Sequence, residues 1–216
     1  MLRLLTQISV GTSTFYYAYK QYGQQISDPY FFNHIFFGLA AILIFAGIGN
    51  AVMKVKLLGT KANTRFLHGF FMSLGTFALV YSVYNVYTAF NLYQKPHAFV
   101  FEYNQDGSFI NLFGKAHGLM GYFLTGIFGL LSLAVPIMFK PGTSKEFLAQ
   151  NGPSHALGGK IFIFLLGIQA IFGAYLCFKH VDPILTIGIA FSVFLAILPY
   201  SNQQQQNKNQ SDKKQK

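Results

Sequence analysis

Four histidines, each near the start of a long apolar run, are the residues of this chain best suited to chemistry. They are His34, His68, His117 and His155. An imidazole inside an apolar membrane segment costs free energy unless a partner satisfies it. Neutral imidazole is also the commonest metal ligand among protein side chains. The recurrence in four consecutive runs predicts that these histidines bind a metal-containing group.

Three of the four histidines have a glycine one helical turn later, at Gly38, Gly121 and Gly159. Residues at i and i+4 lie on the same face of a helix, so each glycine clears space beneath an imidazole for a flat ligand. His68 departs from this pattern because Met72 takes that place. Two other interpretations stay open: interfacial or hydrogen-bonded histidines, and glycines that allow close helix packing.

The composition is typical of a multi-span membrane protein. Of 216 residues, 52% are hydrophobic and 10% are charged, whereas soluble domains carry about 25% charged residues. The one cysteine excludes a disulfide framework within the chain. The net charge of +10 lies largely in short loops beside the apolar runs. That distribution indicates membrane topology and argues against nucleic-acid binding.

We expect an all-α bundle of five strong transmembrane helices and one weak N-terminal one, with a four-helix core. The membrane domain covers residues 28–200, and its strong spans are 32–53, 66–94, 117–139, 155–178 and 183–200. Residues 1–27 form a weak first span, an interfacial helix or a targeting segment. The polar basic tail, 201–216, should be disordered.

Charge asymmetry predicts the orientation of the spans. If the first helix crosses, alternation puts eleven lysines and arginines on one side and four on the other. The richer side is then cytoplasmic and holds both termini. It carries Arg3, Lys54, Lys56, Lys61, Arg65, Lys140, Lys145, Lys208, Lys213, Lys214 and Lys216.

The same alternation sorts the four histidines into two pairs. His34 and His117 head spans that start on the non-cytoplasmic side, whereas His68 and His155 head spans that start on the cytoplasmic side. Two bis-histidine haems would require this arrangement. With both axial positions filled by imidazole, iron can only cycle between ferric and ferrous, which predicts an electron relay. His97 and His180 fall in loops and should be solvated.

Four stretches resemble the cytochrome b561 family of transmembrane electron carriers. They are FFNHIFFGLAAILIFAGIGNAV, TRFLHGFFMSLGTFALV, NLFGKAHGLMGYFLTGIFGLL and PGTSKEFLAQNGPSHALGGKIFIFLLGIQAIFGA. The resemblance covers residues 28–200. It implies a six-helix protein with two haem b groups, one held by His34 with His117 and the other by His68 with His155. It also implies electron transfer from cytosolic ascorbate to monodehydroascorbate or ferric iron on the opposite face.

The resemblance further implies a site for ascorbate, or a similar small anionic reductant, on the cytoplasmic side. Arg65 takes the place where the family often has a lysine, and an anion is attracted electrostatically to the neighbouring cations. The predicted substrate residues are Arg65, Lys56, Lys61 and Lys145. Haem propionates, or membrane topology alone, would explain the same charges.

Several residues depart from the family pattern. The first helix is poor, the chain has no tryptophan, and the family's arginine-rich run before the fifth helix is absent. Lys160 lies inside a span, where it either snorkels to the interface or pairs with a propionate. An alternative function is therefore a non-catalytic membrane subunit that keeps the fold within a larger complex.

The sequence predicts an integral protein in contact with membrane lipid. An endomembrane or the plasma membrane is favoured over the mitochondrial inner membrane. A homodimer is left open.

Overall fold

The computed structural model describes residues 2–53, 61–105, 111–138, 143–178 and 182–198. Its secondary structure there is helical apart from one isolated bridge residue. The helices are α1 (Leu2–Tyr22), η1 (Gly23–Gln25), α2 (Pro29–Ala40), η2 (Ala41–Ala46), α3 (Gly47–Val52), α4 (Lys61–Leu92), α5 (Leu112–Met138), α6 (Lys145–Phe178) and α7 (Pro183–Ile197).

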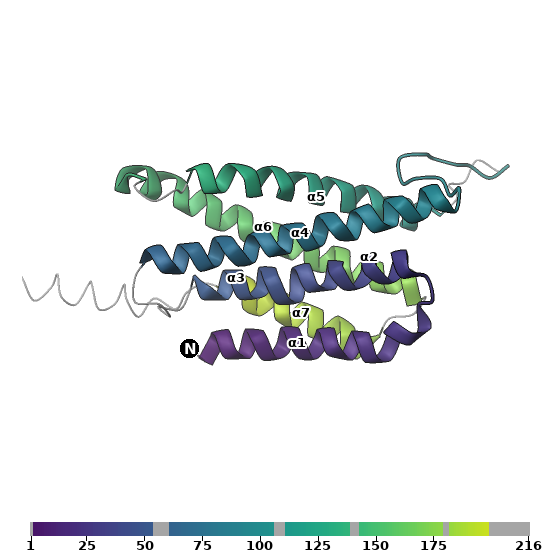
Figure 1. The fold of residues 1–216 in the computed structure, drawn as a ribbon, viewed down its shortest axis with the longest axis horizontal. Helices are drawn as coiled ribbons and strands as arrows, with labels where there is room; N and C mark the ends of the chain where they lie inside the picture. The colour runs from purple at the N-terminus through teal and green to yellow at the C-terminus, as the bar shows by residue number, and fades with distance from the viewer. Residues whose placement is uncertain (1, 54–60, 106–110, 139–142, 179–181, 199–216) are drawn as a thin grey trace, which may run out of the picture.

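Six helical segments lie side by side and alternate in direction (Figure 1), because α2, η2 and α3 form one continuous stretch. The helix pairs α2–α4, α1–α7, α6–α7, α4–α5 and α5–α6 all pack against each other. We call the end of the bundle where α2 and α5 begin the His34 end, and the opposite end the His68 end. The six-helix, all-α expectation is confirmed.

Within the described residues, three helices are long and apolar enough to cross a membrane: Pro29–Val52, Asn63–Leu92 and Glu146–Phe178. They indicate an integral membrane protein that crosses the bilayer more than once. The apolar helix α7 has 15 residues and is shorter than a full span. Helix α5 has 27 residues, of which the side chains of 133–138 lie outside the described part. The count of five strong spans stays a prediction.

Helix α1 is regular over 21 residues although its sequence is only weakly apolar. Its polar residues Gln7 and Thr14 are buried inside the bundle. The Gln7 amide donates to the Ser192 hydroxyl on α7 at 2.8 Å. A Cβ atom at Gly188 would collide with Thr14, so α1 and α7 approach closely there. Part of the weak hydropathy of α1 therefore comes from polar side chains that face its neighbours.

Polar contacts join α1 to α7 at both ends, so the two helices run antiparallel along their full lengths. Near the His68 end, Arg3 donates to the carbonyl oxygens of Leu195 and Leu198 at 2.7 and 2.8 Å. At the His34 end, the Tyr22 hydroxyl donates to the Asp182 carboxylate. The start of α1 and the end of α7 therefore lie at the same end of the bundle.

Helices α4 and α6 begin before the predicted spans 66–94 and 155–178, so the polar segments that precede these spans are helical and not loops. Helix α4 starts at Lys61 and α6 starts at Lys145, ten residues before His155. Ser144 caps α6, since its hydroxyl accepts from the Phe147 amide at 3.1 Å. The polar stretch after it contains good helix formers, and α6 continues through Pro153. The predicted end of the preceding span, at residue 139, lies outside the described residues.

Helices α2 and α7 begin in the same way. Each has Pro as its first residue, and a preceding aspartate, Asp28 or Asp182, accepts the backbone amide of the residue three positions after it. Proline suits this position because its missing N–H would have no partner within the helix. The predicted helix start at Pro183 is confirmed.

Candidate functional site: two histidine pairs

The four histidines lie in two pairs. The ring centres of His34 on α2 and His117 on α5 are 6.3 Å apart, and their planes meet at 78°. The ring centres of His68 on α4 and His155 on α6 are 6.2 Å apart, with planes at 87°. These are the two pairs that span alternation predicts.

The ring spacing fits two imidazoles on one metal ion. A metal–imidazole bond is about 2 Å long, and the bonded nitrogen lies roughly 1 Å from its ring centre, so imidazoles on opposite sides of one ion have centres about 6 Å apart. Both pairs have this spacing. Among the described residues, no group of three or more His, Cys, Asp or Glu side chains could hold a metal ion. Each pair therefore suits a cofactor that supplies the remaining ligands itself.

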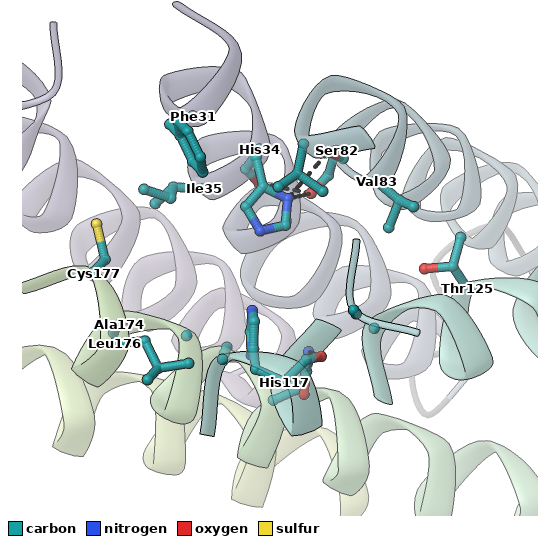
Figure 2. A pocket seen from close by; sticks show the side chains of 18 of the residues that line it. Phe31, His34, Ile35, Ser82, Val83, His117, Thr125, Ala174, Leu176 and Cys177 are labelled. Carbon is teal, nitrogen blue, oxygen red and sulfur yellow. Dashed lines mark hydrogen bonds between the residues drawn. The ribbon is translucent and has the colours of Figure 1, made fainter. Parts of the chain in front are cut away.

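Main-chain carbonyls orient one histidine of each pair. The Nδ1 atom of His34 lies 3.1 Å from the carbonyl oxygen of Ser82, and that of His68 lies 2.8 Å from the carbonyl oxygen of Gly49. The Ser82 hydroxyl also lies 3.1 Å from His34 Nδ1 and donates to the His34 carbonyl (Figure 2). A hydrogen bond at one ring nitrogen leaves the other, Nε2, for a metal.

His117 is positioned by packing against α6. Its backbone carbonyl accepts from the Gln169 amide at 2.6 Å. A Cβ atom at Gly173 would lie 2.6 Å from Cε1 of the imidazole, so only glycine leaves room for this ring. The Nδ1 atom of His117 is buried and has no hydrogen-bond partner in the described part of the chain. Sequence analysis did not identify Gly173, because it contacts His117 from a different helix.

A largely apolar cavity of about 440 Å³ lies around His34 and His117. Figure 2 shows the two imidazoles facing each other across it. Its volume falls within the range of small-molecule and cofactor sites. Gly38 and Gly121 line it, as a flat ligand would require. Added Cβ atoms would lie 3.2 Å from the Ser82 hydroxyl and the Gln169 amide respectively, so the glycines also serve close packing.

The His68–His155 pair is less enclosed. His155 is exposed, and a Cβ atom at Gly159 would have no heavy atom within 4 Å. Met72, which stands where the other histidines have a glycine, packs against α3. A Cβ atom at Gly49 would lie 3.0 Å from its sulfur. Gly49 thus accommodates Met72 and also orients His68.

The two pairs are well separated along the bundle. His68 and Ser82, which touches His34, are 14 positions apart on α4, so at about 1.5 Å per residue the separation is roughly 21 Å. One pair lies near each end of the same four helical segments.

The predicted cationic residues are only partly described. Arg65 is exposed and Lys160 is half-buried near the start of its span. Lys56 and His180 lie outside the described residues, as do the side chains of Lys61 and Lys145. A shared anion site formed by these residues stays a prediction.

Sequence analysis misjudged two residues near the His34 end: His97, between α4 and α5, and Lys115, on α5. His97 was expected to be solvated, but its ring is half-buried. Its ring stacks on Tyr87 and Phe99 with centres 4.6 and 5.3 Å away, and its Nε2 lies 2.9 Å from the Asn91 side-chain oxygen. Lys115 is buried. Its place two residues before His117 was the available signal, but its charge counted only towards topology.

No protein-family model matches the chain, and no curated protein is significantly similar to it.

Proposed function

We propose that the protein is a transmembrane electron carrier of the cytochrome b561 type. His34 and His117 would hold one haem b, and His68 and His155 would hold the other. The observation that carries the proposal is the ring spacing of 6.3 and 6.2 Å at two separate pairs. The hydrogen bonds at Nδ1 of His34 and His68 support it, because they direct Nε2 towards a metal.

The chain would select one kind of chemistry from the cofactor. Haem iron, when bound, supplies a reversible ferric–ferrous couple. Two imidazoles at each site would leave no axial position open for oxygen or peroxide. The apolar lining around His34 and His117 would keep water away from that site. These residues therefore favour electron transfer over oxygen activation.

The electron donor and acceptor follow from the family resemblance alone. Electrons would enter from cytosolic ascorbate, or a similar anionic reductant, at the His68 end. They would leave to monodehydroascorbate or ferric iron at the His34 end. Exposed Arg65, three residues before His68, is suited to attract the anion.

The test is the visible spectrum of the purified full chain before and after reduction. We expect a haem b α-band on reduction, two haems per chain, and reduction of at least one haem by ascorbate. Substituting His68 or His155 by leucine should lower the haem count from two to one, and so should substituting His34 or His117.

The matched control is His97→Gln, which removes a half-buried histidine outside the two pairs and should keep both haems. Wild-type protein without haem would contradict the proposal. Loss of both haems, or of neither, in every single variant would contradict the pairing.

A second candidate is a non-catalytic membrane subunit that keeps the fold. Exposed His155 and the open space at Gly159 favour it, because they leave the His68 pair uncovered. It predicts stable co-purification with partner proteins and no haem that ascorbate reduces.

A further inference from the structure

We propose that the mouth of the cavity at the His34 end binds a carboxylate through Lys115, with Lys95 as a second cation. Both lysines line the cavity that His34 and His117 share. Lys95 lies at its rim, with its ammonium group 5.7 Å from the ring centre of Phe31. The cavity is otherwise largely apolar, so a ligand inside it would meet its positive charge at this mouth.

Lys115 is a buried cation with a loose ion pair. Its side chain is only 7% exposed, and its ammonium group donates to the carbonyl of His97 at 3.0 Å and, at a longer 3.4 Å, to that of Pro96. The carboxylate of Glu102 lies 3.7 Å away, beyond hydrogen-bonding distance. A buried charge is costly unless it is closely paired. A carboxylate that bonded directly to Lys115 would relieve this cost.

Glu102 already places one carboxylate near Lys115. Its side chain is 44% exposed, so it can rotate into solvent at little cost in free energy. The chain thus holds an acidic group of its own near the cation, but too far away to form a hydrogen bond. An incoming carboxylate would compete with Glu102 for Lys115. Removal of the Glu102 charge should therefore strengthen binding, whereas removal of the Lys115 charge should weaken it.

The carboxylate has two candidate sources that share this chemistry. One is a propionate of a haem held by His34 and His117, and this case rests on the proposed function. The other is a small organic acid that reaches the mouth from outside.

The experiment compares the full-length wild type with Lys115→Gln, Lys115→Arg and Glu102→Gln in detergent. Lys20→Gln is the matched control, because Lys20 is exposed and does not line the cavity. The first measurement is haem transfer from the His34 pair to excess apomyoglobin, in a His68→Leu background that retains this haem alone. The second is the thermal midpoint of each protein with and without succinate as the carboxylate probe.

If the carboxylate is a propionate, Lys115→Gln should speed haem loss about tenfold, the effect of losing one hydrogen bond to a charged group. Lys115→Arg should stay near the wild type, and Glu102→Gln should slow the loss. If the carboxylate is a free acid, haem loss should not change. Succinate should then raise the thermal midpoint of the wild type, raise that of Glu102→Gln further, and leave that of Lys115→Gln unchanged.

The proposal is overturned if Lys115→Gln behaves like Lys20→Gln in both measurements. A wild-type protein that contains no haem refutes the proposed function separately. In that case the succinate measurement alone decides for or against the Lys115 site.

Discussion

At the scale of single residues, the imidazoles of His34 and His68 are both held by main-chain carbonyls, those of Ser82 and Gly49. A carbonyl oxygen is present at every residue, so no sequence pattern reveals which one will orient a ring. The sequence does reveal the histidines, because an imidazole in an apolar run is unusual. Their spacing and the directions of their spans predict two pairs, and the structure brings those pairs together. Gly173 could not be predicted, since its contact with His117 depends on how two helices pack.

Gly173→Ala should disturb the His34–His117 site alone. The new methyl group would lie 2.6 Å from His117 Cε1 and would displace the imidazole from its present position. Overpacking of this kind costs about 1–3 kcal/mol. We expect a lower thermal midpoint and loss of one haem of two, measured by unfolding and by reduced-minus-oxidised spectra. Gly129→Ala is the control, because a methyl there meets no heavy atom within 4 Å. Equal behaviour of the two variants would refute the role of Gly173.

At the scale of the elements, Asp182 connects α1 and α7. Its carboxylate caps α7 by accepting the Leu185 amide at 3.0 Å. It also accepts hydrogen bonds from the hydroxyls of Tyr17 and Tyr22 on α1. Burial acts to raise the pKa of Asp182, but the hydrogen bonds that it accepts, first from Tyr22, outweigh burial and hold the pKa below its ordinary value.

The depressed pKa of Asp182 predicts a pH-dependent contribution to stability. A carboxylate with a lower pKa in the folded state stabilises the fold above its unfolded pKa, about 3.9, and this contribution is lost as the pH falls through the folded pKa. Asp182→Asn should therefore flatten the decline of the thermal midpoint below about pH 4. Asp182→Ala should cost about 1–2 kcal/mol at pH 7, because it also removes the cap. Thermal unfolding in detergent from pH 7 to pH 3 measures both effects.

The exposed residue Glu146 supplies the control for this pH series. Glu146→Gln should leave the decline as steep as in the wild type. An Asp182→Asn protein that loses stability on acidification as steeply as the wild type would count against the pKa assignment.

At the scale of the whole molecule, apolar runs between charged loops predict an all-helical bundle, and the structure has one. Sequence analysis placed the helix starts less well. The polar segments that begin α4 and α6 were assigned to loops, because hydropathy marks where a helix is apolar and not where it begins. No sequence pattern predicted the π-helical turn η2 either. There α1 lies so close that a Cβ atom at Gly11 would overlap the Leu43 carbonyl, a contact set by packing between helices.

The arrangement predicts that both termini face the same side of the membrane. Helix α1 starts where α7 ends, since Arg3 bonds the carbonyls of Leu195 and Leu198. Protease-cleavable tags before Met1 and after Lys216 should therefore be cut from the same side of sealed vesicles. A tag inserted after Asn104, between α4 and α5, should be cut only from the opposite side. Cleavage of the two terminal tags from different sides would show that α1 and α7 do not both cross.

The buried polar contacts between α1 and α7 also bear on the order of assembly. Synthesis runs from the N-terminus, so α1 is made before α7, with α2 to α6 between them. Until α7 emerges, Gln7 lacks the hydroxyl of Ser192. An unsatisfied amide is poorly tolerated in lipid. Helix α1 therefore reaches its final position only after α7 has been made, and a chain truncated before α7 leaves Gln7 without the Ser192 hydroxyl.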